Sequence, residues 1–334
     1  MKSSNNWYVK LRDPYWRCGL VLLCLFTVSP VQAKQTVIVL VGAPGNDTYQ
    51  AKFLEWTERW KQVAAKSDAS FQSIGVESGE THDRQRLLEI LSDERSDGES
   101  PLWLVLIGHG TFDGRVAKFN LRGPDVSAAE LAVHLKQFTR PLAIVNCASA
   151  SAPFINQLSS KNRVIVTATK SGFEYNYARF GRFMSEAISD TKADLDKDDQ
   201  TSLLEAFLLA ASRVTEFYES DARLTTENAA IDDNGDGLGT PATWFRGVRT
   251  TRTAKDNTVP DGLRANQFFL LRSAAELQLS PDERQQRDQL EQRLEELRAR
   301  KPSLDSGEYY DLLQEIMLEL ATIYAAAESG EGLQ

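Results

Sequence analysis

The stretches Leu102-Trp-Leu-Val-Leu-Ile107 and Leu142-Ala-Ile-Val-Asn-Cys147 decide the fold of this 334-residue chain. Each is a short, continuous run of mainly apolar side chains, which is typical of a strand buried on both faces of a parallel sheet. Similar runs predict further strands at residues 35–41, 71–76 and 164–168. Between them, apolar residues at helical spacing or a capping motif predict helices at 48–65, 83–94, 127–137 and 178–188.

Strands that alternate with helices along a chain form a parallel sheet with helices on both faces. The sequence therefore predicts an α/β fold, with one large unit over residues 34–275. The remainder, 276–334, has a different pattern, in which Ser280 and Glu283 form a capping box with Pro281 at the first helical position. Two amphipathic segments follow and predict a charged helical hairpin, whose simplest role is packing or dimerisation.

The first 33 residues have the pattern of a secretory signal. Four basic residues and one acid precede an apolar run at 19–28, and small residues lead to a cleavage site after Ala33. The run is shorter than the roughly 20 residues of a membrane span, although a retained membrane anchor is the alternative. We expect export to the periplasm or out of a bacterial cell. Removing the leader changes the formal net charge from −9 to −12, which argues against nucleic acid and anionic lipid as partners.

Two of the three cysteines, Cys18 and Cys24, lie in this leader, so the mature chain keeps Cys147 alone. A single thiol cannot form an internal disulfide, so it is either inertly buried or chemically active. Cys147 and His109 each follow a predicted strand, and active sites of parallel sheets form at the carboxyl ends of the strands. The placement predicts a thiol nucleophile with His109 as its base and acid.

Such chemistry also needs hydrogen-bond donors for the oxyanion. Gly110 has no Cβ, so its backbone N–H can approach a tetrahedral intermediate, and the N–H of Cys147 is a second donor of the same kind. The alternatives to these catalytic roles are a buried, inert cysteine and a structural histidine. His82 and His134 fit the role of base less well, because one lies in a polar loop and the other within a predicted helix.

Together these residues resemble the legumain-type cysteine peptidases of the caspase-fold group. The resemblance rests on Gly108-His109-Gly110, on Cys147-Ala-Ser149-Ala-Ser151 and on the Val166-Thr-Ala168 strand, and it covers about residues 35–250. It implies a catalytic pair of Cys147 and His109 with Gly110 at the oxyanion. It also implies that Asn46 orients the histidine.

The chain departs from that family in the substrate pocket. Where legumains of plants and animals carry a basic pair, this chain has Thr48-Tyr-Gln-Ala51. The segment after the fifth strand is where pocket-lining groups are expected. There, Glu174 and Asn176 are candidates, with Glu174 as a selector for an asparagine or a basic residue, or as an exposed loop acid.

Two acidic loops have the spacing of a calcium site. The ligands predicted in the first are Asp194, Asp196, Asp198, Gln200 and Glu205; those in the second are Asp232, Asn234 and Asp236. The first loop has Asp199 where calcium loops normally have glycine, and the second has Thr243 where they have glutamate. Solvated acidic loops are the alternative for both.

We therefore expect an exported endopeptidase that hydrolyses polypeptides, needs no cofactor for its chemistry and has structural calcium. The hairpin would then serve oligomerisation or autoinhibition. A catalytically silent caspase-fold module that binds a partner is the first alternative, and transpeptidation on the same Cys–His pair is the second. The substrate itself does not follow from the sequence.

Overall fold

The computed structural model describes residues 34–77, 82–252 and 260–329. The predicted signal segment, residues 1–33, lies outside them. Of the helices in the described part of the chain, none is long and apolar enough to cross a bilayer.

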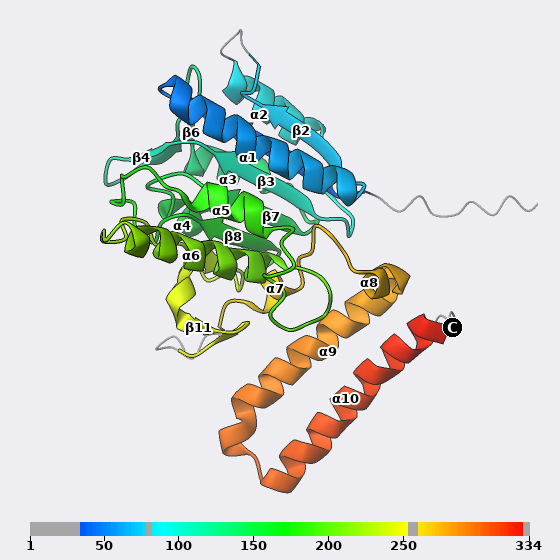
Figure 1. The fold of residues 1–334 in the computed structure, drawn as a ribbon. Helices are drawn as coiled ribbons and strands as arrows, with labels where there is room; N and C mark the ends of the chain where they lie inside the picture. Colours follow the sequence, from blue (N-terminus) through cyan, green and yellow to red (C-terminus); the bar gives the residue numbers. More distant parts are fainter. Residues whose placement is uncertain (1–33, 78–81, 253–259, 330–334) are drawn as a thin grey trace, which may run out of the picture. The chain divides into compact units, whose positions relative to one another are not determined.

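A seven-stranded sheet forms the centre of the fold, with strand order β10-β9-β8-β7-β3-β1-β2 (Figure 1). Its first five strands in chain order are parallel to one another, and β9 and β10 add an antiparallel edge. The strands are β1 Thr36–Val41, β2 Ser70–Ile74, β3 Leu102–Ile107, β7 Leu142–Asn146, β8 Arg163–Thr167, β9 Ala230–Asp232 and β10 Thr240–Pro241. The fold is therefore mixed α/β with a mostly parallel sheet, as the alternating pattern predicts.

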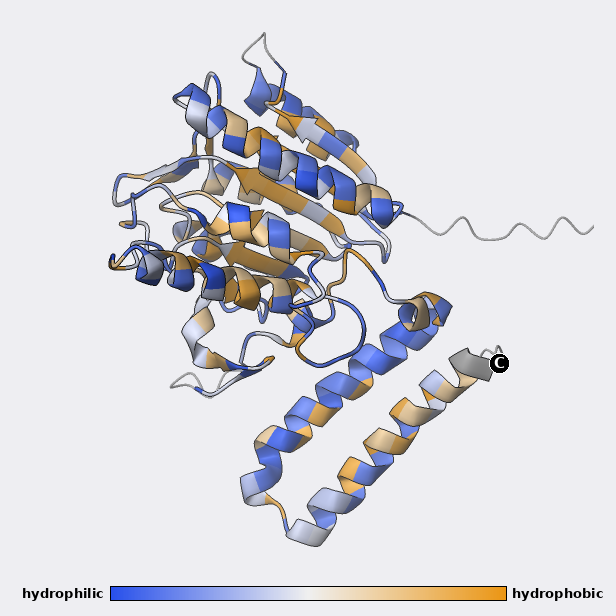
Figure 2. Cartoon of the chain, in the orientation of Figure 1, coloured by the Kyte–Doolittle hydropathy of each residue, from blue (hydrophilic) through white to orange (hydrophobic). Residues whose placement is uncertain are grey.

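Alternation along each strand builds two cores, because successive side chains point to opposite faces of a sheet. In β1, Val37 and Val39 belong to one apolar cluster, whereas Ile38 and Leu40 belong to the other. The strands are the most hydrophobic part of the chain in Figure 2. Since both faces are buried, helices must cover both.

The first face is covered by α1 Asp47–Lys66, α5 Phe180–Ala187 and α6 Leu203–Ser220. The second face is covered by α2 Asp83–Asp93, α3 Ala128–Leu135 and α4 Pro153–Leu158. In α1, the spacing of Phe53, Trp56 and Trp60 places all three on the buried side. The predicted helices are thus confirmed to within a few residues at each end.

A small antiparallel sheet follows β3 and was not expected from the sequence. It consists of β4 Gly110–Phe112, β5 Ala117–Phe119 and β6 Val126–Ser127. Its first strand begins at Gly110, directly after His109. Further short elements are β11 Phe245–Arg246, β12 Arg249–Thr250, α7 Leu263–Asn266, α8 Ala274–Gln278 and the 3-10 turns Ala242–Trp244 and Lys301–Ser303.

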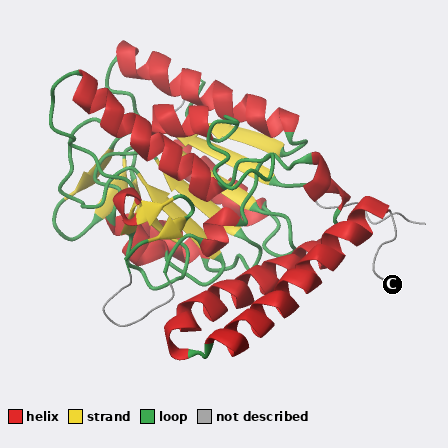
Figure 3. Ribbon diagram, turned by 60° about the horizontal axis from the view of Figure 1, so that its bottom comes forward, coloured by secondary structure: helices red, strands yellow, loops and turns green. Residues whose placement is uncertain are grey.

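The C-terminal helices α9 Pro281–Arg300 and α10 Ser306–Ser329 run side by side in Figures 1 and 3 and form the predicted hairpin. The capping box of Ser280 and Glu283 is present at the start of α9. The two helices share an apolar cluster of their own, which includes Leu290, Leu294 and Ile316. The role of the hairpin stays a prediction.

Candidate active site

Cys147 follows the last residue of β7 and extends its ladder. Its N–H donates to the carbonyl of Leu106 on β3 over 2.9 Å, and the N–H of Ala168 donates to the carbonyl of Asn146 over 2.9 Å. The ends of β3, β7 and β8 therefore meet at one edge of the sheet, where active sites of parallel sheets form.

His109 stands two residues beyond the end of β3 at the same edge. Its Nε2 lies 3.3 Å from the carbonyl oxygen of Pro44, in the loop after β1. The ring also contacts the rings of Tyr49, Phe53 and Tyr177, with centroids 5.0, 5.4 and 5.9 Å away. Burial lowers the pKa of His109 and the bond to Pro44 opposes this shift, so the ring is neutral at neutral pH. A neutral imidazole can accept a proton.

The histidine and the cysteine lie on the same face of the sheet. Cys147 belongs to the apolar cluster under α1 and α5, and so does Phe53, against which the His109 ring packs. In the β3–β7 register Leu106 stands beside Asn146, so Cys147 is next to Ile107 and two positions from the histidine. The two residues that the sequence singled out therefore follow neighbouring strands at one edge of the sheet.

The thiol of Cys147 is closed off in this structure, with 1% of the residue exposed. The start of α5 packs on it so tightly that a Cβ added at Gly181 would lie 2.8 Å from the Cβ of Cys147. Burial raises the pKa of Cys147, and the negative charge of Glu227 raises it further. The sulfur is therefore a neutral thiol in this state, whereas the nucleophilic form is the thiolate.

Gly110 joins the segments that follow β3 and β7. Its N–H donates to the Ser149 hydroxyl over 3.5 Å, and that hydroxyl donates to the Gly110 carbonyl over 3.3 Å. A Cβ at Gly110 would collide with the carbonyl of Ser149, so this contact requires glycine. A 3.5 Å bond is long and weak, so the Gly110 N–H can be given to an oxyanion at small cost.

The second predicted oxyanion donor needs correction. The N–H of Cys147 is already bonded to Leu106 as part of the β3–β7 ladder. A ladder bond is not released without separating the strands, so this N–H does not face an oxyanion here.

The role predicted for Asn46 also needs correction. Asn46 is the N-cap of α1, and its Oδ1 accepts from the N–H of Tyr49 over 3.0 Å. The group that lies against the histidine ring is the carbonyl of Pro44, two residues earlier. The prediction named the correct loop, but the group at the ring is a backbone carbonyl and not an asparagine side chain.

Glu174 does not present a free charge to a substrate. Its carboxylate accepts from the N–H of Lys170 and from both the N–H and the side-chain amide of Asn228, over 2.7–3.2 Å. Its carbonyl accepts from the N–H of Ala150, three residues beyond Cys147. The residue ties the loop after β8 to two neighbouring segments. Asn176 lies exposed in the same loop.

The first predicted calcium loop gathers three of its expected ligands. Carboxylate oxygens of Asp194, Asp196 and Asp198 lie within 4.8 Å of one another. Desolvation raises the pKa of Asp198 to about 6, although its side chain reaches the surface, and the charge of Asp196 adds to the shift. Asp199 has a φ of 62°, the left-handed conformation that the sixth position of such a loop needs.

The other two predicted ligands have different partners. The carboxylate of Glu205 caps α6 by accepting from the N–H and hydroxyl of Ser202, and it also accepts from the N–H of Leu195. The side chain of Gln200 bonds Asp198 and the N–H of Ser273. Three carboxylates therefore lie together in this loop, whereas Glu205 and Gln200 are bonded to other groups.

The second predicted loop begins within the sheet, because Asp232 is the last residue of β9. Asp232 accepts from the N–H of Gly235, and Asn234 and Asp236 bond each other. These are turn interactions. Calcium binding at this loop stays a prediction.

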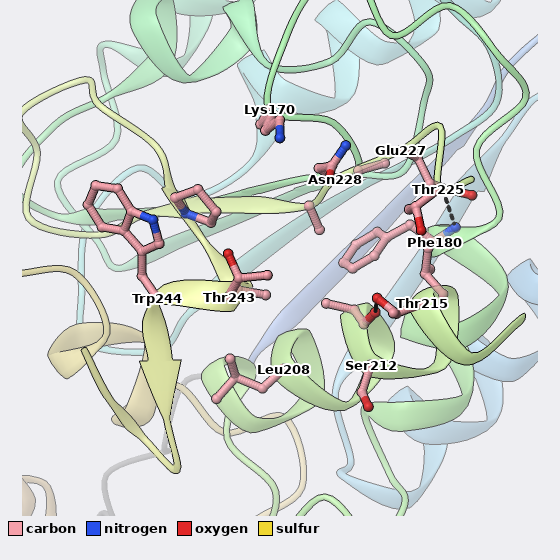
Figure 4. A pocket seen from close by; sticks show the side chains of 16 residues that line it. Lys170, Phe180, Leu208, Ser212, Thr215, Thr225, Glu227, Asn228, Thr243 and Trp244 are labelled. Carbon is pink, nitrogen blue, oxygen red and sulfur yellow. Dashed lines mark hydrogen bonds between the residues drawn. The ribbon is translucent and has the colours of Figure 1, made fainter. Parts of the chain in front are cut away.

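Four residues that shape the site were not singled out from the sequence: Pro44, Tyr49, Tyr177 and Glu227. Glu227 is 1% exposed, and its carboxylate accepts from the N–H groups of Arg179 and Phe180 at the start of α5, the latter bond being drawn in Figure 4. It joins segments nearly fifty residues apart, and no local spacing predicts such a contact. Tyr49 was visible one turn before Phe53, as part of the aromatic face of α1.

No protein-family model matches the chain, and no curated protein matches it. Among solved structures, it is similar to caspase-1 from Spodoptera frugiperda, with a TM-score of 0.40 and 9% identity over 61% of this chain and 87% of that chain. The Drosophila initiator caspase Dronc gives a TM-score of 0.38 and 10% identity over 62% and 82%. The structure of drICE has a TM-score of 0.36 and 12% identity, over 60% of this chain and 87% of that chain. Similarity this distant does not bear on activity.

Proposed function

We propose that the chain is an exported cysteine endopeptidase of legumain type, in which Cys147 attacks the substrate carbonyl and His109 transfers the proton. The observation that supports it is the placement of both residues at adjoining strand ends, on one face of the sheet. Within the described residues, Cys147 is the one free cysteine.

The reaction follows from these groups. The neutral imidazole of His109 takes the thiol proton, and the sulfur of Cys147 forms a bond to the carbonyl carbon. The N–H of Gly110 stabilises the oxyanion. When the intermediate collapses, the C–N bond breaks and His109 returns the proton to the leaving amine. Water, deprotonated by the same histidine, then hydrolyses the thioester and regenerates the thiol.

This chemistry requires the buried thiol to open. Tyr177, in the loop before α5, packs on His109, and its ring is tilted against that of Tyr49 with the centroids 4.5 Å apart. Its hydroxyl is buried and makes no hydrogen bond within the described residues. A buried hydroxyl without a partner is costly, so this loop position is one that the protein can leave. We therefore assign the opening to the loop that carries Tyr177.

Replacing Tyr177 with alanine is expected to speed alkylation of Cys147 by iodoacetamide at neutral pH. Loss of the ring removes packing from His109. An alkylation rate at least tenfold higher corresponds to a free energy of opening that is about 1.4 kcal/mol lower. The rate is measured by mass spectrometry of the labelled peptide. Tyr175→Ala is the matched control, because Tyr175 is 55% exposed in the same loop. Equal rates in both variants would refute the assignment of Tyr177.

Structural calcium at the Asp194 loop is the second part of the proposal, supported by the three gathered carboxylates. Calcium at about one hundred times its dissociation constant is expected to raise the melting temperature by roughly 5 °C. The Asp196→Asn variant should lose most of this gain, whereas Asp221→Asn, an exposed acid outside both loops, should keep it. An equal shift in both variants, or a melting temperature unchanged by calcium, would remove calcium from the proposal.

A catalytically silent caspase-fold module is the second candidate, and the burial of Cys147 is the observation that favours it. The two candidates differ in one result. A module that only binds partners leaves Cys147 unreactive toward alkylation in the folded protein and hydrolyses no peptide.

A further inference from the structure

One side of helix α10 carries a row of exposed, uncharged side chains. Tyr310, Met317 and Tyr324 are 57%, 49% and 39% exposed within the described part of the chain. They follow one another at intervals of seven residues, which is two helical turns, so they lie in a row along the helix. Gln314 and Ala321 come four residues after Tyr310 and Met317 and are also exposed. We call these five residues the outer stripe.

The hairpin does not use the outer stripe for its own packing. A different row of α10, formed by Tyr309, Ile316 and Ile323, is buried. This row packs in one cluster with leucines of α9 that include Leu290 and Leu294. In Figure 2, hydrophobic residues recur along α10, whereas α9 is mostly hydrophilic. α10 therefore has one more apolar row than a two-helix hairpin buries, and an exposed row of this kind marks an interaction surface.

The acidic residues beside the centre of the stripe lie on the other side of α10. Glu315 and Glu319 are each two residues from Met317, and residues two apart are separated by about 200° around a helix. Both pair with Arg293 of α9, with nitrogen–oxygen distances of 3.8 and 3.3 Å. The 24 residues of α10 include no lysine and no arginine. The surface that fits the outer stripe is therefore uncharged, because a basic partner would meet no acid in it.

The outer stripe is itself an uncharged surface of this kind. Met317 stands at its centre, seven residues from each tyrosine, so both ends of the stripe carry the same type of side chain. In a two-fold interface the same patch of both subunits is in contact. A second copy turned about an axis near Met317 brings Tyr310 of one copy to Tyr324 of the other.

We propose that two copies of this chain associate through the outer stripes of their α10 helices. The two hairpins then form a four-helix bundle, in which the surplus apolar row of each α10 is buried. The occupant of the stripe follows from its lack of charge and from its symmetry about Met317. This association does not require peptidase activity.

The contact area predicts a weak dimer. α10 is about 36 Å long and about 11 Å wide with its side chains, so each copy offers a strip of roughly 400 Å². Interlocking side chains bury more than this flat area, and two strips together reach the lower end of specific interfaces, about 1,000 Å². We therefore expect a dissociation constant of about 10 µM.

Sedimentation velocity of the purified protein over roughly 1–200 µM tests this association. The wild type should pass from monomer to dimer in this range. Met317→Glu places like charges together at the centre of the contact, so the dissociation constant should rise at least tenfold. Val133→Glu is the matched control, because Val133 is an apolar residue of α3 that is 73% exposed, and it should keep the wild-type dimer.

A mixture of two variants makes the test specific to the two-fold contact. Met317→Glu and Met317→Lys should each associate weakly alone, whereas their equimolar mixture should associate at least tenfold more tightly than either, because opposite charges then meet near the axis. Both variants should melt within a few degrees of the wild type, since Met317 is half-exposed. A wild type that stays monomeric throughout, equal dimers of Met317→Glu and Val133→Glu, or a mixture no tighter than its components would each overturn the proposal.

Discussion

Replacing Cys147 with alanine is expected to reduce peptide hydrolysis by about 10³-fold or more, because in the proposed mechanism its sulfur bonds to the substrate carbonyl. Activity is measured as kcat/KM on peptide substrates. The fold should remain, since alanine fits the buried site that Cys147 occupies at 1% exposure.

The control for this prediction is the thermal stability of the variant. Removing one buried sulfur leaves a small void, so the melting temperature should fall by only a few degrees. Full activity in a folded Cys147→Ala protein would show that another group is the nucleophile.

Replacing His109 with alanine is expected to lower kcat/KM by roughly 10²–10⁴-fold, the usual contribution of a general acid and base. The pH profile gives the more specific readout. Burial lowers the pKa of His109, so the wild-type rate should fall only as the pH drops below the ordinary histidine value near 6.5. The variant should lose this acidic limb.

His134→Ala is the matched control, since His134 lies on α3, whose packing is against the opposite face of the sheet. Its activity and its acidic limb should equal those of the wild type. If His109→Ala kept the limb, the titrating group would have to be a different residue.

The sheet and its covering helices were predictable because their signal is local. Continuous apolar runs predicted β1, β3 and β7, and the aromatic spacing predicted α1. The small sheet after His109 was missed because its strands have only two or three residues, too few to show a period. The antiparallel strand β9 was missed for a different reason, since the acids at its end suggested a calcium loop.

The candidate site was predictable as two residues at neighbouring strand ends, whereas its surroundings were not. His109 and Cys147 could be placed by the rule that sites form where parallel strands end. The groups around them come from distant segments, as when Glu227 caps the start of α5 and Tyr177 packs on His109. Such contacts depend on how loops pack in three dimensions, and a single sequence does not contain that information.

The burial of the Cys147 thiol could not be predicted from the sequence. A lone cysteine at a strand end is compatible with both an inert and a reactive state. The structure shows the neutral, buried state, with the Cys147 pKa raised by burial. The proposed activity therefore depends on opening of the loop that carries Tyr177.

The most direct test of the catalytic pair is irreversible labelling by a mixture of peptidyl acyloxymethyl ketones, read by mass spectrometry of the digested protein. We expect one modified residue, Cys147, and a labelling rate that falls at least tenfold in His109→Ala but not in His134→Ala. Labelling at a different residue, or an equal rate in the two histidine variants, would contradict it.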